Sequence, residues 1–266
     1  MSLCLILDHT YQREKKLSYQ VFFAINFVLC LFGMKIINWL LVQKARRPNF
    51  FSFLLLTPLL STRAFNKTVK HKHSLIILLL KLFLALTFLG SILIIAKFVV
   101  PMKSYLGILF ISPSIYFVTE SMGALGQILM NSFRPIMAIH KNPLSSKSLG
   151  DFWGLRWNIW VQDWLRDIST SQKKHLSKKL LLTFFVSGLF HELMVNLPFY
   201  LYFNRNYFGN MTLYFAIQGI GLWVEKKWLF NFPDLIKRSY TWIVIILPTP
   251  LFIAQPLLTF FRITHE

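Results

Sequence analysis

The residues best suited to chemistry are His191 and Glu192, because both lie inside an otherwise apolar stretch. Around them the sequence reads Ser-Gly-Leu-Phe-His-Glu-Leu over 187–193. A neutral imidazole can take a proton from a hydroxyl group as that group attacks a carbonyl carbon. Apolar surroundings disfavour the charged imidazolium, so they keep the ring able to accept that proton. The pattern predicts a general base at His191, while a neutral histidine bonded to a neighbouring helix is the structural alternative.

The same stretch does not predict a metal site. Its continuation, His-Glu-Leu-Met-Val-Asn, lacks the second histidine of the zinc-binding His-Glu-x-x-His pattern. Cys4 and Cys30 form neither a Cys-x-x-Cys pair nor a disulfide framework. We interpret both cysteines as packing residues and expect no cofactor.

A second polar cluster reads Asp-Phe-Trp-Gly-Leu-Arg-Trp-Asn over 151–158. The amide of Asn158 does not titrate, but it can donate a hydrogen bond to an oxyanion or orient an acyl group. Ser148, three residues before Asp151, predicts the start of a helix, because a serine side chain can bond the backbone N–H three residues on. The cluster therefore predicts a helix that presents polar side chains.

Four tryptophans continue from this cluster at spacings of four, three and four residues: Trp153, Trp157, Trp160 and Trp164. On a regular helix this spacing places the four indoles on one face. Tryptophan favours the membrane–water interface, so the stripe by itself predicts an interfacial anchoring helix. Arg156 and Asn158 lie off the stripe, where they can border an intramembrane cavity.

These residues need a membrane scaffold, and the composition predicts one. Hydrophobic residues make up 55% of the 266 residues and charged residues only 15%, against about 25% in soluble domains. A spanning helix needs about 20 apolar residues, and six stretches approach that length: Ser18–Val42, Ser74–Ala96, Ser104–Leu129, Leu180–Tyr202, Met211–Trp228 and Tyr240–Phe261. The fold class expected is all-α, a single polytopic membrane domain over 1–266.

Two features fit the spans less simply. The stretch Phe50–Leu60 has only about eleven residues, too few to cross a core about 30 Å thick, so it predicts a re-entrant or interfacial segment. Lys81 lies inside the second span, where a charge is costly. We expect its side chain to extend towards the basic end of that span.

The formal net charge of +19 follows the loops. Intervals 43–73, 131–179 and 226–238 hold seven, nine and four Lys and Arg, whereas the two alternate loops hold only Lys97, Lys103 and Arg205. Such asymmetry predicts that the basic loops face the cytoplasm. It argues against nucleic-acid binding, which needs a basic globular surface, and leaves anionic lipid headgroups and coenzyme A phosphates as ligands for the basic face.

The two clusters together resemble the wax-synthase branch of the membrane-bound O-acyltransferases. That branch carries an Asp-Phe-Trp-Gly-x-Arg-Trp-Asn element followed about 30 residues later by Ser-Gly-x-x-His-Glu in an apolar helix. Both occur here, in that order, and the resemblance covers roughly 132–225. It implies transfer of an acyl group from acyl-CoA, as co-substrate, to the hydroxyl of a lipophilic alcohol such as a long-chain alcohol or sterol.

The resemblance also implies site residues. The intramembrane histidine of the family corresponds to His191, and its second catalytic position corresponds to Asn158. We expect Trp153, Arg156, Trp157 and Glu192 to bind substrate. No serine or cysteine pairs with a base in a triad, so direct transfer without an acyl-enzyme is expected. The membrane would be the endoplasmic reticulum of a eukaryote or the inner membrane of a bacterium.

Two other classes remain as alternatives. A small transporter or channel would use His191 and Glu192 as a proton relay, but it leaves the 151–158 element without a role and needs repeats that the chain lacks. A catalytically inactive scaffold is the other alternative, and the presence of both motif residues argues against it.

Overall fold

The computed structural model describes residues 3–42, 47–66, 72–99, 105–169, 176–229, 231–261 and 263. Throughout these residues the secondary structure is helical and no strand forms, as the all-α prediction requires. The elements are α1 (Leu3–Leu41), α2 (Phe50–Leu55), α3 (Thr62–Asn66), α4 (Leu75–Val99), α5 (Tyr105–Ile111), α6 (Pro113–Met130), η2 (Pro143–Ser145), α7 (Leu149–Asp151), η3 (Phe152–Arg156), α8 (Ile159–Ser169), α9 (Leu176–His191), η4 (Glu192–Asn196), α10 (Leu197–Phe203), α11 (Asn210–Val224), η5 (Glu225–Leu229), α12 (Asp234–Ile246), α13 (Thr249–Phe252) and α14 (Gln255–Phe260).

Within the described residues, four helical stretches are long and apolar enough to cross a membrane. They are Ser18–Leu41, Leu75–Lys97, Tyr105–Met130 and Leu180–Phe203, and they coincide with the first four predicted spans. Many of their large hydrophobic side chains are exposed, for example Ile76 and Leu106. Such surfaces need lipid around them, so the chain is an integral, multi-pass membrane protein.

The predicted count of six spans is not confirmed. The fifth stretch forms α11 and continues as the short helix η5. The sixth is wrong as a single span, because it divides into α12, α13 and α14. Pro248 precedes α13 and Pro256 lies in the first turn of α14, and a proline ring cannot continue a preceding helix without a lost hydrogen bond and a clash.

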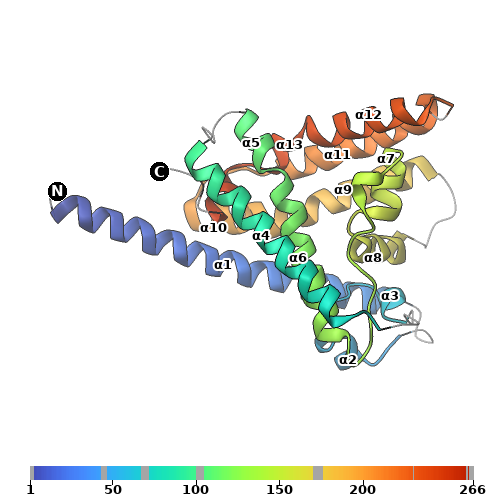
Figure 1. Cartoon of the computed structure of the whole chain (residues 1–266), viewed down its shortest axis with the longest axis horizontal. Coiled ribbons are helices and arrows are strands. Elements are labelled where there is room, and N and C mark those ends of the chain that lie inside the picture. The colour runs from blue at the N-terminus through green and yellow to red at the C-terminus, as the bar shows by residue number, and fades with distance from the viewer. Residues whose placement is uncertain are drawn as a thin grey trace.

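Two helix pairs form the body of the molecule (Figure 1). α4 packs along α6, and α9 packs along α11. α9 and α11 approach closely at Gly188, where an added Cβ would lie 2.7 Å from the Cα of Thr212. α1 contacts η4, α10, α14, α8 and α2, so it joins the α9 side of the molecule to the short helices that follow it.

The expectation for Lys81 is wrong. Its Nζ lies 2.6 Å from Oε1 of Glu120, so the charge is paired between α4 and α6 rather than extended to the basic end. Ion pairing lowers the cost of two charges within a spanning region. The pair could not be seen in the sequence, because its partners belong to different spans.

The stretch Phe50–Leu60 forms only the six-residue α2 followed by a turn, so it does not cross a membrane as one helix. Its carbonyl groups are bound by Lys35 of α1, whose Nζ donates to the oxygens of Leu54 and Thr57 at 2.6 Å each. Lys35 therefore holds this segment against the first span. The two carbonyl oxygens take the place of water around its ammonium group.

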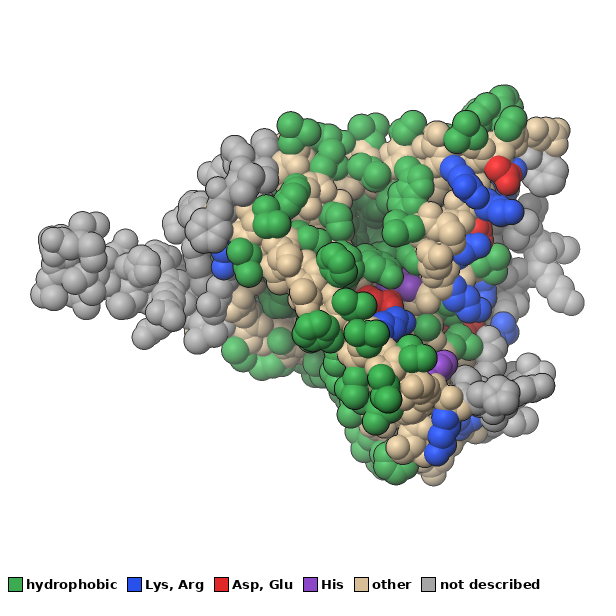
Figure 2. Space-filling model, in the orientation of Figure 1, with side chains coloured by type: hydrophobic (Ala, Val, Ile, Leu, Met, Phe, Trp, Pro, Cys, Tyr) green, Lys and Arg blue, Asp and Glu red, His purple; other side chains and the backbone are tan. Residues whose placement is uncertain are grey.

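Basic side chains gather at one end of the face drawn in Figure 2, around α7, α8 and the start of α12. The intervals 43–73 and 131–179 lie between the first four candidate spans, so the prediction that they share one side of the membrane does not depend on the last two stretches. Several of the lysines counted in the loops lie outside the described residues, among them Lys70, Lys103 and Lys173, and so does the side chain of Cys4. Cys30 packs against the cluster that includes Tyr19 and Phe23, as expected for a packing residue.

Candidate active site

His191 is the last residue of α9 and lies near the middle of the span Leu180–Phe203. Its Nδ1 is 2.7 Å from the carbonyl oxygen of Ser187. A carbonyl can only accept, so Nδ1 carries the hydrogen and the neutral ring keeps its lone pair on Nε2. No side chain in the described part of the chain makes a hydrogen bond to Nε2. The ring is therefore fixed by the backbone, with its basic nitrogen available.

Aromatic rings surround this imidazole. The ring centroid of Phe215 lies 4.5 Å from that of His191, and the centroid of Phe252 lies 5.6 Å away. These contacts come from α11 and α13. The half-buried histidine therefore faces an apolar wall, which is the environment expected for a neutral base acting on a lipophilic substrate.

Glu192 follows His191 in the sequence, but its carboxylate bonds other residues. Its Oε1 accepts the backbone N–H groups of Gly209 at 3.0 Å and Thr212 at 2.9 Å, and its Oε2 accepts Nδ2 of Asn196 at 2.5 Å. A carboxylate at a helix N-terminus satisfies free N–H groups and complements the helix dipole. The buried Glu192 thus caps α11, and its predicted part in substrate binding stays a prediction.

The predicted tryptophan stripe is wrong as a single helical face. Trp153 lies in η3, a π-helical turn closed by the bond from Trp157 N–H to the Phe152 carbonyl. Trp157 itself is extended, and α8 begins only after it. Trp160 and Trp164 are buried in α8, where their indole N–H groups donate to the carbonyls of Met137 and Met34, so they serve packing rather than an interface.

The helix start predicted at Ser148 is confirmed. Ser148 Oγ accepts the N–H of Asp151 at 3.0 Å, and Asp151 Oδ2 accepts the N–H of Lys147 at 3.0 Å. From the opposite side Glu225 accepts the N–H groups of Leu149 at 2.5 Å and Gly150 at 3.0 Å. The backbone donors at the start of this element are therefore satisfied from two directions.

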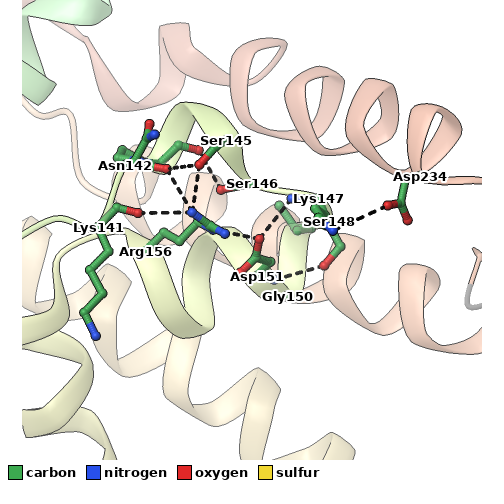
Figure 3. A network of polar contacts seen from close by, with 12 residues as sticks. Lys141, Asn142, Ser145, Ser146, Lys147, Ser148, Gly150, Asp151, Arg156 and Asp234 are labelled. Carbon is green, nitrogen blue, oxygen red and sulfur yellow. Dashed lines mark hydrogen bonds and ion pairs between the residues drawn. The ribbon is translucent and has the colours of Figure 1, made fainter.

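Arg156 organises the loop that precedes this element (Figure 3). Its Nε donates to Asp151 at 2.7 Å, and its Nη1 reaches the carbonyls of Lys141 and Asn142 and the hydroxyl of Ser145. Most of its donor groups are therefore engaged within the protein. The part expected for Arg156 in substrate binding stays a prediction, and its observed contacts hold the loop.

Asn158 lies at the turn between η3 and α8. Its backbone is left-handed, with φ 41°, which asparagine tolerates better than most residues. Its Oδ1 accepts the N–H of Val161 at 3.3 Å, as an N-cap of α8 does. Within the described residues no hydrogen bond engages Nδ2. The side chain therefore caps a helix with its oxygen and keeps its donor for another group.

Asn158 and His191 make no direct contact in the described residues, but aromatic rings connect their surroundings. Trp153 lies 5.9 Å from Phe215 and 6.4 Å from Trp157, centroid to centroid. Trp153 is also fixed through its Nε1, which donates to Gln218 at 3.2 Å. Phe215 contacts His191, so a series of ring contacts runs from Trp157, the neighbour of Asn158, through Trp153 to the histidine.

Three residues that matter to this arrangement were missed in the sequence: Glu120, Glu225 and His140. The two glutamates carried a usable signal, since acidic residues within predicted spans are rare and costly. His140 carried none, because it lies in a polar interval among several basic residues. Only the structure shows that it contacts Trp157, at 4.5 Å between ring centroids.

Comparison with known proteins agrees with this site. Residues 136–218 match the model of the Membrane bound O-acyl transferase family. Probable long-chain-alcohol O-fatty-acyltransferase 8 of Arabidopsis thaliana is 32% identical over 112 residues, which cover 38% of this chain and 30% of the relative. Probable long-chain-alcohol O-fatty-acyltransferase 9 of the same plant is 34% identical over 90 residues, 29% of this chain and 25% of the relative.

The chain thus spans less than a third of the length of the curated relatives that it matches. The matched residues 136–218 nevertheless include both motifs, with Asn158 and His191. The resemblance drawn from those motifs is therefore confirmed: this segment is similar to the Membrane bound O-acyl transferase family and to the plant long-chain-alcohol acyltransferases.

Proposed function

We propose that this protein transfers an acyl group from acyl-CoA to the hydroxyl of a lipophilic alcohol. The observation that carries the proposal is the state of His191. Its Nδ1–H is bound to the Ser187 carbonyl, and its ring lies among aromatic side chains, where none of the described residues makes a hydrogen bond to Nε2. The matching relatives are named as acyltransferases of long-chain alcohols, which favours an alcohol of that class as the acceptor.

In the proposed reaction Nε2 of His191 removes the proton of the alcohol as its oxygen attacks the thioester carbonyl. A new C–O bond forms, the C–S bond breaks, and the thiolate of coenzyme A leaves. The imidazolium then returns the proton to that thiolate, so the histidine ends neutral. General-base assistance of this kind contributes about 10²- to 10⁴-fold in rate.

Asn158 supplies the complementary function. Its Nδ2 donates to the oxygen that gains negative charge as the tetrahedral intermediate forms, a contribution that is typically worth about 10²- to 10³-fold. Its Oδ1 is engaged with the Val161 N–H, so the amide cannot rotate freely. The donor is oriented before substrate arrives, and that preorganisation is what makes such a group effective.

The surface of the molecule suits both substrates. Hydrophobic side chains line a hollow on the face drawn in Figure 2, between α6 and the side of the molecule formed by α7 and α11. An apolar chain from the bilayer suits such a surface. The Lys and Arg side chains at the α7, α8 and α12 end suit the phosphates of coenzyme A. We place the protein in the endoplasmic reticulum of a eukaryote or the inner membrane of a bacterium.

A membrane transporter with a His–Glu proton relay is the competing function, and the contacts of Glu192 argue against it. Its carboxylate receives two backbone N–H groups and the amide of Asn196. A group held in this way to stabilise a helix end is poorly suited to exchange protons with His191. The pair is therefore better explained as one catalytic and one structural residue.

The test is to incubate purified protein in lipid vesicles with labelled acyl-CoA and a panel of long-chain alcohols and sterols. We expect a labelled ester that forms at the rate at which free coenzyme A appears. Hydrolysis alone, or no reaction with any alcohol, would contradict the proposal. Proton uptake by the same vesicles across an imposed gradient, without ester formation, would favour the transporter.

A further inference from the structure

His140 is a buried histidine with both ring nitrogens engaged. Its Nδ1 lies 3.1 Å from the backbone nitrogen of Asn158, and its Nε2 lies 2.9 Å from Oγ1 of Thr119. The Asn158 N–H can only donate, so Nδ1 is the acceptor and the hydrogen is on Nε2. Thr119 gives its own hydroxyl hydrogen to a carbonyl in the preceding turn of α6, that of Ile115 or Tyr116. It therefore accepts from His140, and the ring is held in one tautomer.

The backbone beside His140 supports the same turn. The Ile159 N–H donates to the carbonyl of Ile139 at 2.8 Å, and the Lys141 N–H donates to the carbonyl of Arg156 at 2.9 Å. These two bonds flank Asn158, whose N–H is left for the His140 side chain. The left-handed residue is thus held on both sides by the main chain and at its centre by the imidazole.

We propose that His140 is a positioning residue that holds the Asn158 turn and so aims the Asn158 amide at the reacting carbonyl. The proposal rests on the function proposed for Asn158. Left-handed backbone is uncommon outside glycine and is retained only where surrounding structure holds it. Without the Nδ1 acceptor the Asn158 N–H would be left unpaired, and the turn would relax.

The charge state of His140 suits a constant hydrogen-bond acceptor. Burial and, to a smaller extent, the charge of the nearby Lys81 lower the pKa of His140 to about 3. Glu120, paired with Lys81, and Tyr116 belong to the helices packed against it. The ring therefore stays neutral at physiological pH, and Nδ1 keeps the lone pair that the Asn158 N–H requires.

Two conservative variants separate the two ring nitrogens. H140N places an amide oxygen at the δ position, close to Nδ1, so it keeps an acceptor for the Asn158 N–H. H140Q places its amide one bond further, close to Nε2, so it keeps the contact with Thr119 and loses that acceptor. H73Q is the matched control, because His73 bonds the carbonyl of Ile136 through its Nε2 and makes no contact with Asn158.

The readouts are residue-resolved hydrogen exchange at the Asn158 amide and steady-state kinetics. We expect fast exchange and about a tenfold lower kcat in H140Q, the effect of one lost hydrogen bond, with KM for acyl-CoA unchanged. H140N should restore slow exchange and most of kcat, and H73Q should match the wild type. Slow exchange in H140Q, or equal losses in H140N and H140Q, would overturn the proposal.

The activity of N158D distinguishes failure of this proposal from failure of the proposed function. Fast exchange with normal kcat in H140Q, while N158D is inactive, overturns the positioning role of His140. The same result with an active N158D overturns the catalytic role of Asn158. If H140Q does not fold, H140L serves instead: it removes the Nδ1 acceptor and leaves an apolar side chain in the buried site, and unchanged slow exchange at Asn158 in that variant would also overturn the proposal.

Discussion

The two motif segments place their candidate catalytic residues in opposite ways. His191 lies where α9 passes into the π-helical turn η4 without interruption, whereas Asn158 lies where the chain breaks between η3 and α8. The imidazole is fixed through one nitrogen and keeps the other available. The Asn158 amide is fixed through its oxygen and keeps its Nδ2. Each residue therefore uses one polar atom for position and offers the other, a base at His191 and a donor at Asn158.

In each of the two segments a buried glutamate bonds the backbone of another element. Glu192 caps α11 beside the histidine, and Glu225 caps α7 at the start of the asparagine segment. Both carboxylates are buried and both bond the backbone N–H groups of a separate element. A buried glutamate beside a candidate catalytic residue can thus serve to cap a helix, and the similar bonds of Glu225 support that role for Glu192.

The largest effect expected is at His191. H191Q keeps polarity and most of the volume but removes the titrating nitrogen, so ester formation should fall by about 10²- to 10⁴-fold. H191A should be equally impaired. Labelled-ester synthesis in vesicles measures this, with H73Q as the control for loss of an imidazole. Near-normal transfer in folded H191Q would mean that this residue is only a buried hydrogen-bonding group.

The next effect separates the two atoms of the Asn158 amide. N158D keeps an oxygen for the Val161 N–H and tolerates the left-handed turn, but it has no amide donor. We expect turnover to fall by about 10²- to 10³-fold while thermal stability stays close to wild type. N158A loses both atoms and should lose stability as well. An active N158D would reduce Asn158 to a helix cap.

The paired glutamates should affect stability rather than chemistry. E192Q lacks the charge and one acceptor oxygen at the α11 N-terminus, so the free energy of unfolding should fall by about 3 kcal/mol. E225Q should have a similar effect at α7. Denaturation in detergent and ester synthesis per folded molecule measure the two quantities. A large loss of activity in E192Q without loss of stability would support the substrate-binding role predicted for Glu192 over the structural one.

A smaller effect is expected at Gly188, where α9 meets α11. In G188A the new Cβ would lie 2.7 Å from the Cα of Thr212, a backbone atom that cannot move without its helix. Overpacking of this kind costs about 2 kcal/mol. G90A is the matched control, since nothing lies within 4 Å of its Cβ position in α4. If both variants unfold alike, the close approach of the two helices does not limit stability.

The sequence predicted the His191 segment better than the Asn158 segment, and the reason is physical. An apolar run of about 20 residues must form a helix in a bilayer, because its backbone has no other hydrogen-bond partners. The first four spans and the central depth of His191 follow from that constraint alone. The Ser148 helix start also followed, because capping depends on residues three positions apart.

The break at Trp157 and Asn158 depends on partners distant in sequence. The indole of Trp153 bonds Gln218, and the Asn158 N–H bonds His140. A spacing of four, three and four cannot show such contacts, and it was equally compatible with a straight helix. The Lys81–Glu120 pair escaped prediction for the same reason, since its residues lie in separate spans.

The central claim, that His191 removes the proton of the acceptor, is tested most directly by changing the acidity of the acceptor. A long-chain thiol is far more acidic than the alcohol of equal length and reacts as its thiolate, so it needs a base less. The quantity to measure is the wild-type to H191Q rate ratio for each acceptor. We predict a ratio of about 10² or more for the alcohol and a much smaller ratio for the thiol. Equal ratios for the two acceptors would contradict general-base catalysis by His191.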